Sequence, residues 1–168
     1  MVFCSKIWYE IRMNSQKFDK SDKIILSELQ RRATMPIAEL AEKAGLSASS
    51  CHRRVKLLEE AGVITGYAAQ LDGRALGFAN DFFVEVSLGA QTEEAFEKFE
   101  KAIQRVPEIL ECHLMSGQFD YLLRVAAADA NDYERIHRTK LSRLPGLQRL
   151  QSSLALREVK KWSGYPVI

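Results

Sequence analysis

Residues 37–64 read IAELAEKAGLSASSCHRRVKLLEEAGVI, and they contain the strongest local pattern in the chain. Apolar residues recur at helical spacing from Ile37 to Ala44, and Gly45 is suited to the left-handed conformation that ends a helix. Ser47 is placed to cap a second helix, whose outer face is basic. Two short helices joined by a tight turn are typical of a helix-turn-helix that lays its second helix in the DNA major groove. We therefore expect this part of the chain to bind double-stranded DNA.

The positive charge is concentrated on the second of these helices. The 168-residue sequence has a net charge of only +2, which is too small to indicate nucleic-acid binding by itself. Residues 80–150 have nine Lys/Arg against twelve Asp/Glu, a net charge of −3, whereas residues 47–58 have three basic residues and no acidic one. The candidate DNA contacts are therefore the polar and basic residues of this helix: Ser47, Ser49, Ser50, His52, Arg53, Arg54 and Lys56.

These candidates differ in the roles that their chemistry allows. Arg53 is suited to bidentate donation to guanine, and Lys56 to a phosphate contact. The serines lie where a helix N-terminus holds phosphate, although Ser47 fits a simple helix cap equally well. Arg54 either contacts DNA or forms an ion pair with Glu59 or another carboxylate. These alternatives stay open at the level of the sequence.

The flanking residues extend the predicted DNA-binding domain to residues 19–67. Asp19 is expected to cap the first helix, and Pro36 fits the first position of the next one. Val63–Tyr67 is predicted as a small β-wing, and residues 68–80 as a linker strand. Residues 1–18 are expected to be an N-terminal extension without fixed structure.

Residues 81–162 show a different pattern, in which short strands alternate with two helices. A period-2 strand over residues 82–88 precedes a helix that opens at Thr92, and two strands flank the Gly117–Asp120 turn. A helix to Leu144 and a last strand over Ser152–Lys160 complete the order β-α-β-β-α-β. The expected fold class is α+β: an N-terminal winged helix-turn-helix, a C-terminal ferredoxin-like domain and a short tail at residues 163–168. Because both helices are expected on one face of the sheet, a second copy of the chain is expected to cover the other.

A series of motifs follows the chain from its first helix to its last strand. The first half contains Phe18-Asp19-x-x-Asp22, Glu39-Leu40-Ala41, Gly45-Leu46-Ser47, Arg54-Val55-x-x-Leu58-Glu59 and Gly62-Val63-Ile64-x-Gly66-Tyr67. The second half contains Glu111-Cys112-His113, Ser116-Gly117-x-Phe119-Asp120-Tyr121-Leu122-Leu123 and Leu144-Pro145-Gly146-Leu147. In this order the motifs resemble the Lrp/AsnC family of leucine-responsive and asparagine-responsive regulators. One departure is Phe18-Asp19, where the family usually has Leu-Asp.

The resemblance implies a transcription regulator whose second domain binds a small effector, usually an amino acid, near the Gly117–Asp120 turn. It also implies homodimers formed by these domains, often assembled into octamers. Backbone amides of the turn would hold the effector's carboxylate and Asp120 its amino group, although Gly-x-x-Asp is also ordinary hairpin chemistry. The candidate effector residues are Met115, Gly117, Gln118, Asp120, Tyr121 and Ser152.

The sequence gives no support to several other classes of function. It has no Gly-rich phosphate loop, no Gly-x-Ser-x-Gly and no His-Glu-x-x-His, so we expect no catalytic residues and no enzymatic activity. Three dispersed cysteines lack metal-ligand spacing and favour a reducing cytoplasm, and we expect no cofactor other than the effector. No apolar run approaches the roughly 20 residues that span a bilayer. The remaining alternatives are a nucleoid-associated architectural protein and a metabolite-binding protein or enzyme of ferredoxin-like fold.

Overall fold

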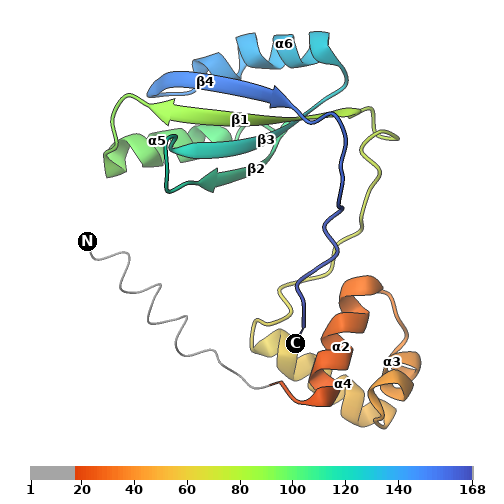
Figure 1. Ribbon diagram of the computed structural model, residues 1–168. Coiled ribbons are helices and arrows are strands. Elements are labelled where there is room, and N and C mark those ends of the chain that lie inside the picture. Colours follow the sequence, from red (N-terminus) through yellow and green to blue (C-terminus); the bar gives the residue numbers. More distant parts are fainter. Residues whose placement is uncertain (1–17, 168) are drawn as a thin grey trace. The chain divides into compact units, whose positions relative to one another are not determined.

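The computed structural model describes residues 18–167, so almost all of the predicted extension at residues 1–18 lies outside the described residues. The chain forms two compact units, each with its own hydrophobic core. The helical unit comprises the described residues up to Ala69 together with those from Lys161 onward. The sheet unit comprises Gln70–Lys160. Figure 1 shows the helices and strands of both units.

Three helices form the helical unit: α2 (Lys20–Arg31), α3 (Ile37–Ala44) and α4 (Ala48–Glu60). The Asp19 carboxylate accepts the amide of Asp22 at 2.9 Å, and the Asp22 carboxylate accepts the amide of Asp19 at 3.3 Å. This reciprocal capping box satisfies two amides at the start of α2. Pro36 is the N-cap of α3, one residue before the predicted position, and Gly45 ends α3 with a φ of 66°. The turn between α3 and α4 is therefore as tight as the sequence predicts.

All three helices contribute to the core of the helical unit. Each fully buried aliphatic side chain stabilises the fold by about 1.5–3 kcal/mol relative to its exposed state. Burial also raises the pKa of the Cys51 thiol, which therefore stays protonated and unreactive at neutral pH. Because the inner face of α4 is fixed in this core, its opposite face is held outward. The buried members are Ile25, Met35, Leu40, Ala41, Ala44, Cys51, Val55 and Leu58.

The structure differs from the sequence prediction directly after α4. Within residues 18–167 no strand lies between α4 and the first strand of the sheet unit, so neither the β-wing at Val63–Tyr67 nor the linker strand at 68–80 forms. The amides of the first two residues of the expected wing both donate to the carbonyl of Leu58. Residues 73–78 form a turn with their own hydrogen bonds. These local bonds replace the strand-to-strand ladder that a wing requires.

The sheet unit contains four antiparallel strands in the order β2-β3-β1-β4. The central strand β1 pairs with β3 on one side and with β4 on the other. This arrangement confirms the α+β fold class and the ferredoxin-like β-α-β-β-α-β order. The elements are β1 (Asn80–Leu88), α5 (Glu93–Ile103), β2 (Ile109–Leu114), β3 (Tyr121–Ala127), α6 (Ala130–Thr139), η1 (Leu141–Arg143) and β4 (Leu147–Leu154).

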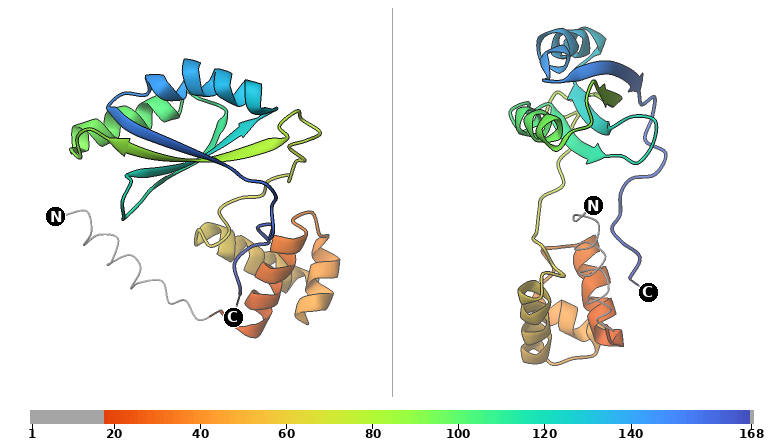
Figure 2. Two further views of the ribbon diagram at one scale, coloured as in Figure 1. Left: turned by 45° about the horizontal axis from the view of Figure 1, so that its top comes forward. Right: turned by 90° about the vertical axis from the view of Figure 1, so that its left-hand side faces the viewer.

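The two faces of this sheet differ in chemistry. Both α5 and α6 lie on one face, as the right-hand view of Figure 2 shows, and their apolar sides pack against the strands. The opposite face presents Phe83, whose side chain is 40% exposed. Beside it, Arg124 forms ion pairs with Asp81 at 2.8 Å and with Glu111 at 2.9 Å. The sheet residues buried under the helices include Val84, Val86, Leu123 and Val125.

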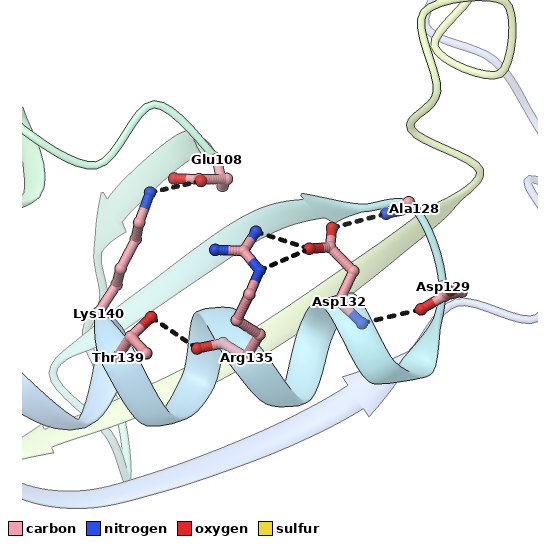
Figure 3. A network of polar contacts seen from close by, with 7 residues as sticks. All are labelled: Glu108, Ala128, Asp129, Asp132, Arg135, Thr139 and Lys140. Atoms are coloured by element: carbon pink, nitrogen blue, oxygen red, sulfur yellow. Dashed lines mark hydrogen bonds and ion pairs between the residues drawn. The ribbon is translucent and has the colours of Figure 1, made fainter.

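Charged contacts hold both ends of α6, as Figure 3 shows. At the N-terminus the Asp129 carboxylate accepts the amide of Asp132 at 2.8 Å, and Asp132 forms an ion pair with Arg135 at 2.6 Å. Just past the C-terminus, Lys140 forms an ion pair with Glu108, which precedes β2. The first two contacts stabilise the start of α6 itself, and the third joins its C-terminal end to the residue before β2.

Two element boundaries differ from the sequence prediction. α6 ends at Thr139 and is followed by the short η1 turn, rather than running to Leu144, because the Lys140 backbone leaves the helical region. β4 runs from Leu147 to Leu154, not from Ser152 to Lys160. The amide of Ala155 makes the last bond to β1, and the chain then runs past the end of that strand. The residues after Ala155 have no neighbouring strand to pair with, so the apolar alternation that continues there does not extend β4.

By its contacts the C-terminal segment from Lys161 onward groups with the helical unit, whereas the predicted domain at 81–162 and tail at 163–168 stay predictions. The backbone of Tyr165 forms two hydrogen bonds with the side chain of Gln30 in α2. The sheet unit is thus an insertion within the helical unit. None of the described helices is long and apolar enough to cross a membrane.

Candidate DNA-binding helix and effector pocket

The outer face of α4 carries the polar candidates at helical spacing. Ser49, His52, Arg53 and Lys56 are exposed, while Cys51, Val55 and Leu58 of the same helix are buried. Among the basic residues of α4, and within residues 18–167, only Arg53 makes no ion pair. Lys56 makes one weak contact, at 4.0 Å from Glu60 across an exposed surface. The structure therefore presents two cations on one side of this helix.

Serine side chains form hydrogen bonds with one another at the N-terminus of α4. The Ser47 hydroxyl accepts the amide of Ser50 at 3.3 Å and also lies 3.0 Å from the Ser50 hydroxyl. Ser49 lies 3.2 Å from the same oxygen. Ser47 is thus the N-cap of α4, which is the simpler of its two predicted roles. Ser49 and Ser50 stay candidates for a phosphate contact at this helix end.

Arg54 points away from the outer face and toward α2. Its Nη1 lies 2.7 Å from Asp19 and 2.8 Å from Asp22. The amide of Asp22, together with this guanidinium, holds the pKa of the Asp19 carboxyl below its usual value. Of the two roles that the sequence left open, the structure gives Arg54 the ion pair, with carboxylates of α2 and not with Glu59. Its inclusion among the DNA contacts is corrected accordingly.

A contact that sequence reasoning missed replaces the expected wing. The Tyr67 hydroxyl donates to the Glu59 carboxylate in the last turn of α4 at 2.8 Å. Burial, together with the neighbouring Glu59 carboxylate, raises the pKa of Tyr67 to about 12. This hydrogen bond fixes the chain against α4 without any strand. Both residues stand in the recognised motifs, but nothing in their spacing of eight residues signals a contact.

Asp120 has a structural role in the turn between β2 and β3. Its side chain is buried, and its Oδ2 accepts the amide of Leu88 at 2.7 Å. Its Oδ1 accepts the side-chain amide of Gln91 at 2.8 Å, a partner that the sequence did not indicate. The carboxylate therefore satisfies one donor at the end of β1 and one shortly after it. Each carboxylate oxygen thus accepts one hydrogen bond within the chain, and the capture of an effector's amino group by Asp120 stays a prediction.

Two further effector candidates lie on the helix-covered face of the sheet. Tyr121 is buried, and its hydroxyl donates to Glu100 of α5 at 2.8 Å. Ser152 pairs with Val84 across the strands and accepts the hydroxyl of Tyr133 from α6. The structure thus separates both residues from the turn's exposed side, on which Gly117 and Gln118 lie.

A pocket of about 330 Å³ lies on the uncovered face of the sheet beside this turn. β1 and β4 contribute cross-strand neighbours, since Glu85 pairs with Gln151 and Ser87 pairs with Arg149. The pocket places a carboxylate and a guanidinium in one small space, together with amide and hydroxyl groups. Of the predicted effector residues, only Gln118 lines it; Met115 and Gly117 lie nearby in the chain without lining it. The lining residues are Glu85, Ser87, Gln118, Phe119, Arg149 and Gln151.

Comparison with known protein families agrees with both units. Residues 18–65 match the winged helix-turn-helix DNA-binding family, and residues 81–164 match the Lrp/AsnC ligand binding domain. The chain belongs to the Lrp/AsnC family. This membership confirms the resemblance found in the sequence. It makes the chain a DNA-binding transcription regulator, in a family of regulators rather than of enzymes.

Similar Lrp/AsnC proteins align over most of their length. The leucine-responsive regulatory protein of Haemophilus influenzae is 41% identical over 150 residues, which are 89% of this chain and 90% of that protein. The proline dehydrogenase transcriptional activator of Rhodobacter capsulatus is 40% identical over 141 residues, 84% of this chain and 92% of that protein. A transcriptional regulator from Neisseria meningitidis, solved with L-methionine, has a TM-score of 0.85 at 34% identity, covering 90% of this chain and 97% of that one.

Proposed function

We propose that this Lrp/AsnC regulator inserts α4 into the major groove, with Arg53 reading a base and Lys56 meeting a phosphate. The observation that carries this proposal is the different environment of the two adjacent arginines, Arg53 and Arg54. Arg54 is held by two carboxylates of α2, whereas Arg53 is exposed on the outer face. An unpaired guanidinium in the groove is suited to bidentate donation to guanine. His52, Ser49 and Ser50 flank this contact.

The proposed effector is an amino acid bound in the pocket on the uncovered sheet face. Arg149 would hold its α-carboxylate and Glu85 its α-ammonium group, since a zwitterion offers this pair of charges. Gln118 would contact the ligand from the turn, and Met115 and Gly117 precede it in the chain without lining the pocket. Asp120 would stabilise the turn through its hydrogen bonds to Leu88 and Gln91. The Neisseria relative, solved with L-methionine, supports an amino acid as the class of ligand.

The proposed assembly is a homodimer that associates further into an octamer in the cytoplasm. The uncovered sheet face, with its exposed Phe83, supports a second copy as its cover. Paired recognition helices would then meet two half-sites on the DNA. An effector that binds one arrangement of the subunits better than another shifts the spacing of these helices, and with it the affinity for DNA.

The test of the DNA site is fluorescence anisotropy with the promoter DNA next to the gene, at moderate salt. We expect preference for this DNA over a scrambled duplex, and loss of that preference in Arg53→Ala. Arg74→Ala, which removes an exposed cation outside α4, is the matched control and should bind normally. Equal binding to scrambled DNA by the unmodified protein would favour an architectural role instead.

The test of the effector site is a thermal-shift screen with the twenty amino acids. A ligand that binds only the folded protein raises its stability by RT ln(1 + [L]/Kd). We expect Arg149→Ala and Glu85→Gln to abolish the shift produced by the active amino acid. Arg143→Ala removes an exposed arginine that does not line the pocket and should preserve it. A shift that survives in both pocket variants would place the effector elsewhere.

A further inference from the structure

The chain passes between the two units at two places. It leaves the helical unit after Ala69, and it returns after Lys160. The return follows β4, the strand that contributes Arg149 and Gln151 to the pocket, after a six-residue segment without helix or strand at residues 155–160. This second connection can restrain the helical unit only if the returning segment is attached to that unit.

The attachment is a pair of hydrogen bonds between Gln30 and Tyr165. The Gln30 Nε2 donates to the Tyr165 carbonyl at 3.1 Å, and the Tyr165 amide donates to the Gln30 Oε1 at 2.7 Å. One side-chain amide thus satisfies both groups of a single residue 135 positions away. Gln30 lies in the last turn of α2, so the contact reaches the helix whose start is fastened to α4 by Arg54.

Gly164 is fitted to this contact by two independent features. Its φ of 98° lies in the region that favours glycine. A Cβ at this position would lie 2.3 Å from the Gln30 Oε1 and 2.7 Å from its Cδ. A side chain here would therefore both strain the backbone and displace the Gln30 amide.

Apolar burial contributes little to the attachment. The rings of Trp162 and Tyr165 stack edge to face with centroids 4.9 Å apart, yet they are 65% and 76% exposed. The stacking orders the segment locally. Its position on α2 depends on the Gln30 hydrogen bonds.

We propose that residues 161–167 are a strap that fastens β4 to α2 and so restrains the helical unit through a second tether. A unit held by two tethers has fewer positions open to it than a unit held by one. The restraint lowers the conformational entropy that the helical units lose when their recognition helices bind DNA. Only the effect on DNA binding rests on the proposed function; the fastening itself does not.

The test uses the full-length protein and variants on each side of the contact. Gln30→Ala removes both hydrogen bonds and leaves the strap's sequence intact, whereas Gly164→Ala displaces the strap and leaves α2 intact. Gln104→Ala, an exposed glutamine at the end of α5, is the matched control. Hydrogen exchange followed by mass spectrometry reports the amides of residues 161–167. We expect roughly tenfold faster exchange of the Tyr165 amide in both variants, since its hydrogen bond to Gln30 is lost, and no change in the control.

Two further measurements separate the strap from its consequences. Small-angle scattering should show a larger maximum dimension in both variants if the second tether restrains the helical unit. Affinity for the promoter DNA should fall about equally in both variants and in the double variant. Unchanged exchange in Gln30→Ala would overturn the fastening. Faster exchange with unchanged scattering and unchanged DNA affinity would overturn the restraint. Failure of the unmodified protein to bind DNA would count against the proposed function alone, because exchange and scattering still decide the strap.

Discussion

Arg54 of α4 and Asp22 of α2 are joined by an ion pair of 2.8 Å across 32 residues of sequence. Asp19 accepts from the same guanidinium nitrogen at 2.7 Å. The two carboxylates also form the capping box that starts α2. One arginine therefore fastens the recognition helix to the cap of another helix, while its neighbour Arg53 faces outward.

The first prediction separates these adjacent arginines. Arg54→Ala should lower the Tm of the helical unit by about 5 °C, because it removes ion pairs and leaves two carboxylates facing each other. Arg53→Ala should leave the Tm unchanged and weaken binding to the promoter DNA by about 1–3 kcal/mol. Calorimetry and anisotropy on the same samples measure both effects. A stable Arg54→Ala protein with weakened DNA binding would return Arg54 to the DNA contacts.

The second prediction concerns the Asp120 carboxylate. Asp120→Ala leaves the Leu88 amide without its acceptor, which should cost about 1–3 kcal/mol of unfolding free energy. Gln91→Ala, which removes only the second donor, should cost less. Urea unfolding measures this order. If Asp120→Ala instead retained full stability and lost only the effector's thermal shift, Asp120 would be a ligand contact and not a support of the turn.

The third prediction concerns pH and the Glu108–Lys140 pair. Burial raises the pKa of Glu108, but the hydrogen bond and charge of Lys140, together with a backbone hydrogen bond and the charge of Arg135, leave the pKa below its usual value of 4.5. A carboxylate with a lowered pKa contributes stability that is fully present above 4.5 and is lost as pH falls through the folded pKa.

Glu108→Gln removes this titration while keeping the side chain's shape. Its stability should therefore decline less than that of the unmodified protein between about pH 5 and about pH 3. Urea midpoints measured across this range give the comparison. Parallel declines in the two proteins would show that Glu108 does not contribute to acid sensitivity.

The fourth prediction concerns salt. Neutralised phosphates release counterions, so the logarithm of the DNA affinity falls with the logarithm of salt concentration by about 0.9 for each phosphate contacted. Lys56→Ala should make this slope shallower by about 2 in a dimer, one phosphate being lost per subunit. Arg54→Ala should leave it unchanged. Titrations at several salt concentrations decide the point, and an unaltered slope in Lys56→Ala would remove it from the phosphate contacts.

Features that depend on local sequence were predictable in this chain. The caps at Asp19 and Ser47 and the turn at Gly45 follow from side-chain chemistry within a few residues, and the structure has all three. The order of strands and helices follows from periodicity in the same way. The outward face of α4 follows from the burial of Cys51 and Val55 on its other side.

Features that depend on distant partners were not predictable. Arg54 finds its carboxylates on another helix, and Asp120 finds a main-chain amide at the end of another strand. The missing wing has the same cause, since a strand exists only where a partner backbone lies beside it. The pocket could not be predicted without the strand register, because only the pairing of β1 with β4 brings Glu85 and Arg149 to one surface.

The insertion of the sheet unit between two stretches of the helical unit determines how chimeric regulators should be built from this chain. A DNA-binding module excised at Ala69 alone would lack the residues that contact Gln30. Grafting this module onto a foreign sensor therefore calls for two splice points, with residues 161–167 carried over as part of the transplant.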